Sequence, residues 1–369
     1  MKSVFGLIGA IVLFVWGGVA SANAPLLSKE ALTAQIAQLQ AQNSEVPGFT
    51  ISIIQNDKVV SAASGVAAPD QTPMTAQTPF RLASVTKTFV AAAILRLHEQ
   101  GLLILDSPIQ DHLSQAHLEL LEHGGYDTAA ISVRHLLMHS SGMNDHFGTA
   151  EMREMVFANP RKIWTRTEQI ALMTRVTDPL GQAGERFVYS DTGYLLLGEI
   201  IERQTGKPLG KAVADLNRFA DIGLASMVWE GETAPDHKVG RAHQWLNGFD
   251  TFGLHGSVDA FGGGGLIGDV TQIASYFDAL FDGRVFDRPS TLELMKTAPG
   301  HPEASPYRIG LFRQMIGPNE VFMHGGFWGV QAIHVPSLDL TIATVALDQS
   351  GDRAIKSMAF GMIEASQPQ

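Results

Sequence analysis

The stretch Phe80-Arg81-Leu82-Ala83-Ser84-Val85-Thr86-Lys87-Thr88-Phe89 carries more structural information than any other part of this 369-residue sequence. It leads from a loop into a strongly apolar segment, 88–100, whose spacing predicts a helix that Gly101 ends. If that helix begins at Ser84, the Ser84 hydroxyl lies at its N-terminus, where backbone N–H groups favour developing negative charge. Lys87 then lies on the same face, one turn further on, within reach of the hydroxyl. The apolar helix would desolvate Lys87, which lowers a lysine pKa and makes the amine a usable base.

Other interpretations compete with a Ser84 nucleophile. A Ser-x-x-Lys tetrad arises by chance, and a serine at a helix start is commonly only an N-cap. No serine has glycine at both −2 and +2, so the chain has no nucleophile elbow. Ser140 and Ser141 follow a histidine, but a turn before Gly142 explains them better than catalysis does.

The sequence favours no metal site and no cofactor. It contains no cysteine, which rules out a catalytic thiolate, Cys-ligated zinc and iron–sulfur clusters. Its thirteen histidines include no His-Glu-x-x-His pair. His139 and His146 would share a helix face only if Gly142 did not interrupt the helix. A metallohydrolase therefore stays as an outside alternative, which EDTA-insensitive activity would remove.

Strand patterns gather at the two ends of the chain and helical patterns in the middle. A helix over 28–44 precedes strands at 48–54 and 58–63, while 105–241 mixes helices with loops. After a bend at Gly262-Gly263-Gly264-Gly265, the late segments predict a helix at 271–281, strands at 310–316, 320–324, 328–335 and 338–346, and a last helix at 352–365. These patterns predict an α/β (α+β) fold, in which both chain ends build one antiparallel sheet flanked by the terminal helices. We expect a single domain over 25–366, with a sheet part at 25–80 and 242–366 and an inserted, mostly helical part at 81–241.

The first residues have the order of a secretory signal peptide. Lys2 precedes an apolar run over 4–19 and then the small residues Ala20-Ser21-Ala22-Asn23-Ala24. Cleavage after Ala22 is favoured over Ala24, because the latter would leave Pro25 at the new N-terminus. We therefore expect export to the periplasm or the medium, with no stable membrane span after cleavage. An uncleaved membrane anchor is the alternative.

Composition and charge limit the partners. Apolar residues make up 45% of the chain and charged residues 17%, as in ordinary globular proteins. The formal net charge is −11, and no Lys/Arg block provides the basic footprint that nucleic acid needs. The expected partner is a small molecule or short peptide as substrate. The sequence does not indicate an oligomeric state.

Four blocks, in order, carry a resemblance to a known family. They are the Ser84 block at 80–89, Ile131 to Gly142, Gly184 to Tyr194 with Tyr189-Ser190-Asp191, and His324-Gly325-Gly326. The chain resembles the serine β-lactamase and penicillin-binding-protein superfamily, specifically the class C β-lactamase-like branch with its esterases and D-aminopeptidases. The resemblance spans about 28–366 and implies a β-lactamase/transpeptidase-like fold.

The resemblance also implies roles for particular residues. Ser84 would be acylated, and Lys87 and Tyr189 would share the work of general base and acid. Without the neighbouring motifs, Tyr189 would be read as a buried aromatic with a satisfied hydroxyl. The backbone N–H groups of Ser84 and Phe327 would form the oxyanion hole, each worth roughly 3 kcal/mol of barrier. Which of Lys87 and Tyr189 is the principal base stays open.

Two departures from the family pattern bear on the substrate. Asp191 replaces the family asparagine, and a carboxylate accepts but cannot donate hydrogen bonds. If Asp191 is ionised near Lys87, it stabilises the ammonium, and Tyr189 becomes the better candidate for the base. His324 replaces the family lysine that meets the substrate carboxylate, and histidine is mostly neutral at pH 7.

These departures predict a serine hydrolase that acts on small esters or amides, with weakened β-lactam recognition. Asp191, His324, Gly325, Gly326 and Phe327 are its predicted substrate-binding and oxyanion residues. Alternatives are a β-lactamase, a D,D-carboxypeptidase or D-amino-acid amidase, and a penicillin-binding-like protein without turnover.

Overall fold

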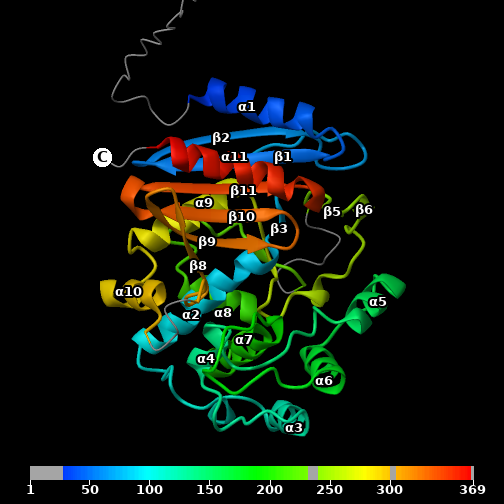
Figure 1. The fold of residues 1–369 in the computed structure, drawn as a ribbon, viewed down its shortest axis with the longest axis vertical. Coiled ribbons are helices and arrows are strands. Elements are labelled where there is room, and N and C mark those ends of the chain that lie inside the picture. Colours follow the sequence, from blue (N-terminus) through cyan, green and yellow to red (C-terminus); the bar gives the residue numbers. More distant parts are fainter. Residues whose placement is uncertain (1–27, 232–239, 300–304, 367–369) are drawn as a thin grey trace, which may run out of the picture.

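A six-stranded antiparallel sheet forms one layer of the protein in the computed structural model, which describes residues 28–231, 240–299 and 305–366 (Figure 1). Its strand order is β2-β1-β11-β10-β9-β8. The strands are β1 (Gly48–Gln55), β2 (Lys58–Gly65), β8 (Phe312–Ile316), β9 (Asn319–Gly326), β10 (Val330–Val335) and β11 (Leu340–Ala346). β1 pairs with β11, with Phe49 opposite Ala346, so the two ends of the chain meet in the middle of the sheet.

Helices cover both faces of this sheet. The terminal helices α1 (Lys29–Gln42) and α11 (Asp352–Ala365) pack on one face, and α9 (Val270–Phe281) packs on the other (Figure 1). Alternation along β1 explains this arrangement: Phe49, Ile51 and Ile53 join the cluster under α1 and α11, while Ile54 joins the core on the opposite side.

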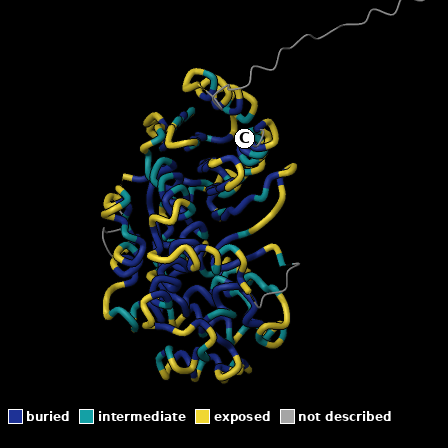
Figure 2. Tube along the Cα trace, turned by 90° about the vertical axis from the view of Figure 1, so that its left-hand side faces the viewer, coloured by how far each residue is buried: buried dark blue, intermediate teal, exposed yellow. Residues whose placement is uncertain are grey.

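The second layer is mostly helical and is built around α2 (Thr86–Glu99). Every residue of α2 except His98 is buried, as expected of a helix that is apolar on all sides. The other helices are α3 (Gln115–His123), α4 (Val133–Leu137), α5 (Ala150–Ala158), α6 (Arg166–Val176), α7 (Asp191–Thr205), α8 (Leu209–Leu216) and α10 (Pro289–Thr297). Figure 2 shows buried chain running through this layer, with exposed residues gathered at the periphery.

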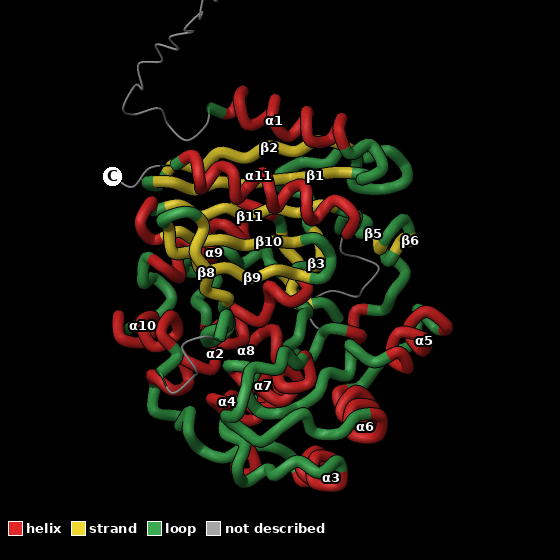
Figure 3. The backbone as a smooth tube through the Cα atoms, viewed as in Figure 1, coloured by secondary structure: helices red, strands yellow, loops and turns green. Residues whose placement is uncertain are grey.

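Short strands connect the two layers. β3 (Phe80–Arg81) and β4 (Val228–Trp229) pair with β7 (Leu266–Gly268), and β5 (Trp245–Leu246) pairs with β6 (Phe249–Asp250). Figure 3 shows β3 between the sheet and the helical layer and β5 and β6 at one edge. The chain reaches Ser84 directly from β3, so this small sheet positions the start of α2.

The predicted fold class is confirmed: one antiparallel sheet from both chain ends, terminal helices on it, and a helical insertion. The predicted strands at 310–316 and 328–335 are shorter, since β8 begins at Phe312 and β10 at Val330. The proposed signal segment at 1–22 lies outside the described residues. Among the described helices, none combines the length and apolar character needed to cross a membrane.

Candidate active site

Ser84 sits in a 3-10 turn, Ala83–Val85, between β3 and α2. The condition that the α-helix begins at Ser84 is not met, because Ala83 adopts φ +46° and α2 begins at Thr86, two residues before the predicted helical pattern at 88–100. Just before this turn, the Arg81 guanidinium donates two hydrogen bonds from Nε and Nη2 to the buried Glu230 carboxylate. This pairing anchors β3 to the segment that follows β4, and so fixes the turn that carries Ser84.

The Lys87 ammonium is completely buried and contacts three acceptors. Its Nζ lies 2.9 Å from Ser84 Oγ and 2.7 Å from the Gly263 carbonyl oxygen, and it also donates to the Asp191 carboxylate. An ammonium has three donors and no acceptor. All three Lys87 protons are thus engaged, and none of its atoms can accept the Ser84 proton while the amine stays protonated.

Electrostatics keep Lys87 protonated. Burial by itself lowers the Lys87 pKa, but the negative charge of Asp191, with further contributions from Tyr189 and Asp259, raises that pKa above its usual value. Burial likewise raises the Asp191 pKa, but Lys87 more than offsets this and the net pKa is lowered. The expectation that desolvation turns Lys87 into a resting base is therefore wrong, and the proximity of Asp191 and Lys87 is confirmed.

Tyr189 lies beside Lys87 and lines the same cavity as Ser84. Its ring centroid is 5.2 Å from Lys87 Nζ. Burial raises the pKa of Tyr189 to about 12, even though Lys87 and a hydrogen bond with Ser84 lower it. The structure therefore brings together Ser84, Lys87, Tyr189 and Asp191, as the sequence predicted.

His139 positions Tyr189 by binding the two residues that flank it in the sequence, Val188 and Ser190. The His139 carbonyl oxygen accepts a hydrogen bond from Val188 N at 2.7 Å, and His139 Nδ1 accepts one from Ser190 N at 3.1 Å. The His139 ring also packs on the Tyr189 ring, with centroids 4.2 Å apart. The sequence interpretation placed His139 next to a turn, which is correct, but it missed this support because the contact spans 50 residues.

Two further carboxylates, Asp145 and Asp259, lie near Asp191 and line the cavity. Asp145 Oδ1 accepts a hydrogen bond from Asp191 N at 3.2 Å. Burial, and then the negative charge of Asp191, raise the pKa of both Asp145 and Asp259 to about 7. Neither residue stands in a recognisable motif, so sequence reasoning had no signal for them.

The glycine run 262–265, where the sequence predicted a bend, packs closely against Asp191 and Asp259. A Cβ on Gly264 would lie 2.0 Å from Asp259 Oδ2, and one on Gly262, which has φ +123°, would lie 2.4 Å from the Tyr194 carbonyl oxygen. Only glycine allows the backbone to approach this closely. The run thereby delivers the Gly263 carbonyl to Lys87.

His324 does not reach the cavity. Its side chain is buried, with Nε2 3.0 Å from the Tyr307 hydroxyl and Nδ1 2.9 Å from the Gly325 carbonyl oxygen. Burial, and then the positive charge of Lys87, lower the pKa of His324 to about 3, so the imidazole is neutral. The predicted contact of His324 with a substrate is therefore not supported, because aromatic packing around Tyr307 holds the ring inside the protein.

The residues after His324 do reach the site. A Cβ on Gly326 would lie 2.3 Å from the Leu82 carbonyl oxygen, so glycine is what lets the end of β9 pack against the Ser84 turn. Phe327 follows at once, is 42% exposed and lines the cavity. Phe327 thus lines the same cavity as Ser84, and the role of its backbone N–H as an oxyanion donor stays a prediction.

The cavity itself has a volume of about 330 Å³, within the range of small-molecule sites. It lies between the sheet layer and the helical layer. Its polar end holds Ser84, Tyr189 and the three aspartates. The rest of its lining is mainly apolar and comprises Phe147, Gly148, Met152, Arg153, Val156, Phe157, Leu246, Leu254, Val258, Phe327 and Trp328.

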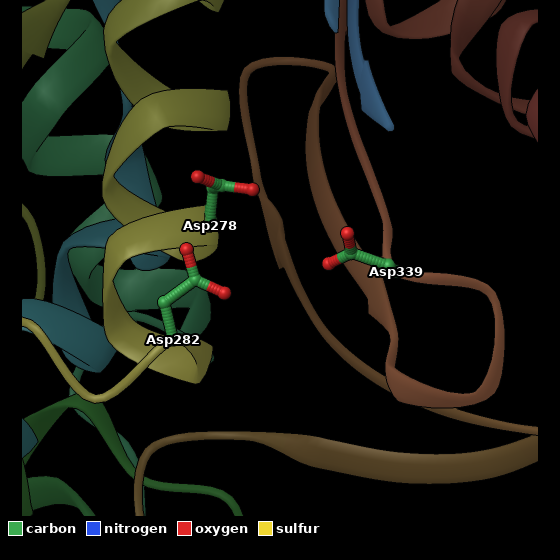
Figure 4. Close-up of side chains that lie close together, drawn as sticks. All are labelled: Asp278, Asp282 and Asp339. Carbon is green, nitrogen blue, oxygen red and sulfur yellow. The ribbon is translucent and has the colours of Figure 1, made fainter. Parts of the chain in front are cut away.

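A separate acidic group lies away from this cavity. Asp278 and Asp282 at the end of α9 face Asp339, which follows β10 (Figure 4). Arg284 Nη2 donates to Asp278 at 2.5 Å and to Asp282 at 3.1 Å. This guanidinium already compensates two of the three carboxylates, so we assign the group no role.

An antiparallel sheet with the terminal helices on one face, and a serine and a lysine three residues apart beside it, defines the serine β-lactamase and penicillin-binding class of protein. The chain belongs to the Beta-lactamase family, whose model matches residues 33–362. The predicted resemblance to the serine β-lactamase and penicillin-binding-protein superfamily is thereby confirmed.

Similar proteins include hydrolases of different specificity. The D-aminopeptidase of Gluconobacter oxydans is 24% identical over 319 residues, which cover 81% of this chain and 55% of that protein. Esterase EstB of Burkholderia gladioli is 32% identical over 181 residues, 45% of this chain and 43% of that one. The D-stereospecific amidohydrolase of a Streptomyces species superposes with a TM-score of 0.75 at 24% identity, covering 90% of this chain and 98% of the other. The chain spans about half the length of the curated relatives it matches.

Proposed function

We propose that this protein is a serine hydrolase that forms an acyl-enzyme at Ser84 from a small ester or amide. The observation that carries the proposal is the 2.9 Å contact of Ser84 Oγ with Lys87 Nζ, at the end of a cavity that Tyr189 also lines. Relatives named as an esterase, a D-aminopeptidase and an amidohydrolase support this class of reaction.

The proposed reaction has two steps. Ser84 Oγ attacks the substrate carbonyl carbon, and its proton passes by way of Tyr189, with Lys87 holding the charge, to the departing alcohol or amine. The Ser84 and Phe327 backbone N–H groups would stabilise the oxyanion. Water then adds to the acyl carbon, the bond to Ser84 Oγ breaks, and a carboxylic acid leaves as Ser84 regains a proton.

The charges at the site argue against β-lactams as good substrates. Such molecules carry a carboxylate, whereas the cavity near Ser84 holds Asp191, whose lowered pKa keeps it ionised, and Asp145 and Asp259, whose pKa of about 7 leaves them partly ionised at neutral pH. The Lys87 charge is engaged by Asp191. The neutral, buried His324 offers no countercharge there.

A comparison of nitrocefin with p-nitrophenyl acetate and p-nitrophenyl butyrate tests this preference. We expect kcat/KM to be at least about tenfold higher for the esters, the effect of one unfavourable charge contact. Initial rates at matched pH and ionic strength, with Ser84→Ala as the blank for both substrate types, give the ratio. Nitrocefin turnover far above ester turnover would overturn the proposed preference.

The pH profile of Asp191→Asn tests whether the Asp191 charge sets the pKa of Lys87 and Tyr189. The charge of Asp191 raises the pKa of both Lys87 and Tyr189, so removing it lowers both, whichever of the two is the base. Wild-type kcat/KM should therefore rise from neutral to alkaline pH, as the unprotonated base is populated. In Asp191→Asn this rise should move to lower pH by roughly one unit.

Asp106→Asn is the matched control for this measurement. Asp106 is 69% exposed and pairs with Arg134 at the surface, so its replacement should leave the profile in place. An unshifted profile for Asp191→Asn would show that Asp191 does not set the ionisation that limits catalysis.

A further inference from the structure

The cavity that holds Ser84 also has an apolar part. Residues of α5 and Leu246 of the β5–β6 hairpin contribute to its lining. Ala83, the neighbour of the nucleophile, belongs to the same buried apolar cluster as Met152 and Val156 of α5. Leu254, Val258 and Trp328 belong to the same cluster, and all three line the cavity together with Met152 and Val156. The apolar side chains that line the cavity with Ser84 therefore include residues of α5 and residues packed in one cluster with Ala83.

Charge is distributed unequally along this cavity. The three lining carboxylates are gathered around Lys87, as their mutual effects on pKa require. Among the described lining residues, Arg153 is the one other charged side chain. It is exposed, and its Nη1 donates to the Gly148 carbonyl oxygen at 2.8 Å. The surface beneath α5 thus has no buried charge to solvate a polar group.

Two exposed aromatic rings stand where α5 meets the hairpin. Phe157 of α5 lines the cavity and is 41% exposed, and Phe249 of β6 is 47% exposed. Their rings meet edge to face with centroids 5.3 Å apart. Large exposed aromatic side chains next to a cavity are typical of a surface that contacts apolar ligand groups.

We propose that this apolar part is an acyl-chain subsite, and that the preferred substrates carry an uncharged aliphatic acyl group longer than acetyl. The inference rests on the proposed acyl-enzyme at Ser84. The acyl group is the part of the substrate that stays bonded to Ser84 Oγ through both steps, so an apolar surface in the same cavity as Ser84 supports it in both. Burying each additional methylene favours the bound state by a factor of about four at most.

The chain-length dependence of p-nitrophenyl esters tests the proposal. We measure kcat/KM for acetate, butanoate, hexanoate, octanoate and dodecanoate below their solubility limits, with Ser84→Ala as the blank. The value should rise roughly two- to fourfold per methylene while the chain fills the cavity. It should fall again for dodecanoate, because the volume is limited to about 330 Å³.

A variant that fills the subsite sharpens the test. Val156 is 7% exposed and lines the cavity, so Val156→Trp should lower kcat/KM for octanoate at least tenfold while acetate changes little. Ala158→Trp adds the same ring on an exposed position of the same helix and should leave the whole series unchanged. A second series of alkyl acetates, in which only the alcohol varies, should show a flat profile.

The outcomes separate this inference from the proposed function. A Ser84-dependent activity with a flat acyl series, or with length dependence in the alcohol series alone, overturns the acyl subsite and leaves the hydrolase intact. Ester hydrolysis that persists unchanged in Ser84→Ala overturns both. Loss of the octanoate preference in Ala158→Trp as well as in Val156→Trp would mean that the effect is general to α5, which also counts against the subsite.

Discussion

Replacement of Ser84 by alanine should lower kcat/KM for the best ester by at least about 10³-fold, because no acyl-enzyme can then form. The fold should survive this change. Ser84 is only partly buried and contacts the Lys87 ammonium with its hydroxyl, so losing that hydrogen bond should cost about 1 kcal/mol of unfolding free energy. Thermal unfolding and far-UV circular dichroism check that the variant is folded before its activity is compared.

Covalent labelling makes the same experiment independent of the substrate. A fluorophosphonate probe should add to wild type with one label per chain and should not add to Ser84→Ala. Ser141→Ala is the matched control, because Ser141 is buried next to a histidine-containing turn and its hydroxyl accepts from Met143 N. Label that persists in Ser84→Ala, or that disappears in Ser141→Ala, would show that the nucleophile has been assigned to the wrong serine.

The parts of the fold that the sequence predicted well are those where a local pattern and the tertiary structure agree. The strand patterns at both chain ends and the apolar segment after Ser84 each form the predicted element, and β1 and α2 bury nearly all of their residues. The sequence left open whether the helix begins at Ser84; a 3-10 turn precedes α2 because Ala83 takes a left-handed φ, a preference that alanine does not signal. Short strands such as β5 and β6 have two residues each and give no periodic pattern.

The site was predicted where motifs place residues on one turn or at one strand end, and missed where distant segments converge. Ser84 and Lys87 are three residues apart, so helical geometry alone brings them together. His324 was misjudged because its position in a motif says nothing of Tyr307, whose hydroxyl keeps the ring inside. The raised pKa of Asp145 and Asp259 comes from their burial and from the charge of Asp191, both of which arise only on folding.

Replacement of Tyr189 by phenylalanine should lower kcat by roughly 10²- to 10⁴-fold, the usual contribution of a positioned general acid or base. The structure makes this expectation specific. Lys87 already uses its three protons on Ser84, Asp191 and Gly263, so Tyr189 carries the hydroxyl that can relay the Ser84 proton. Because substrate binding does not need that hydroxyl, KM should change much less than kcat.

Tyr194→Phe is the matched control, since the chemical change is identical and the ring lies near the same lysine. Lys87 Nζ is 5.5 Å from the Tyr194 ring centroid, but the Tyr194 hydroxyl donates to the Leu137 carbonyl oxygen at 3.1 Å, inside the helical layer. Its loss should cost stability of about 1 kcal/mol and leave kcat within severalfold of wild type. Equal losses in the two variants would mean that packing around Lys87, and not the Tyr189 hydroxyl, limits the reaction. If Tyr189→Phe retained full activity, with the alkaline rise of the profile unchanged, proton transfer would instead fall to Lys87 in its rare neutral form.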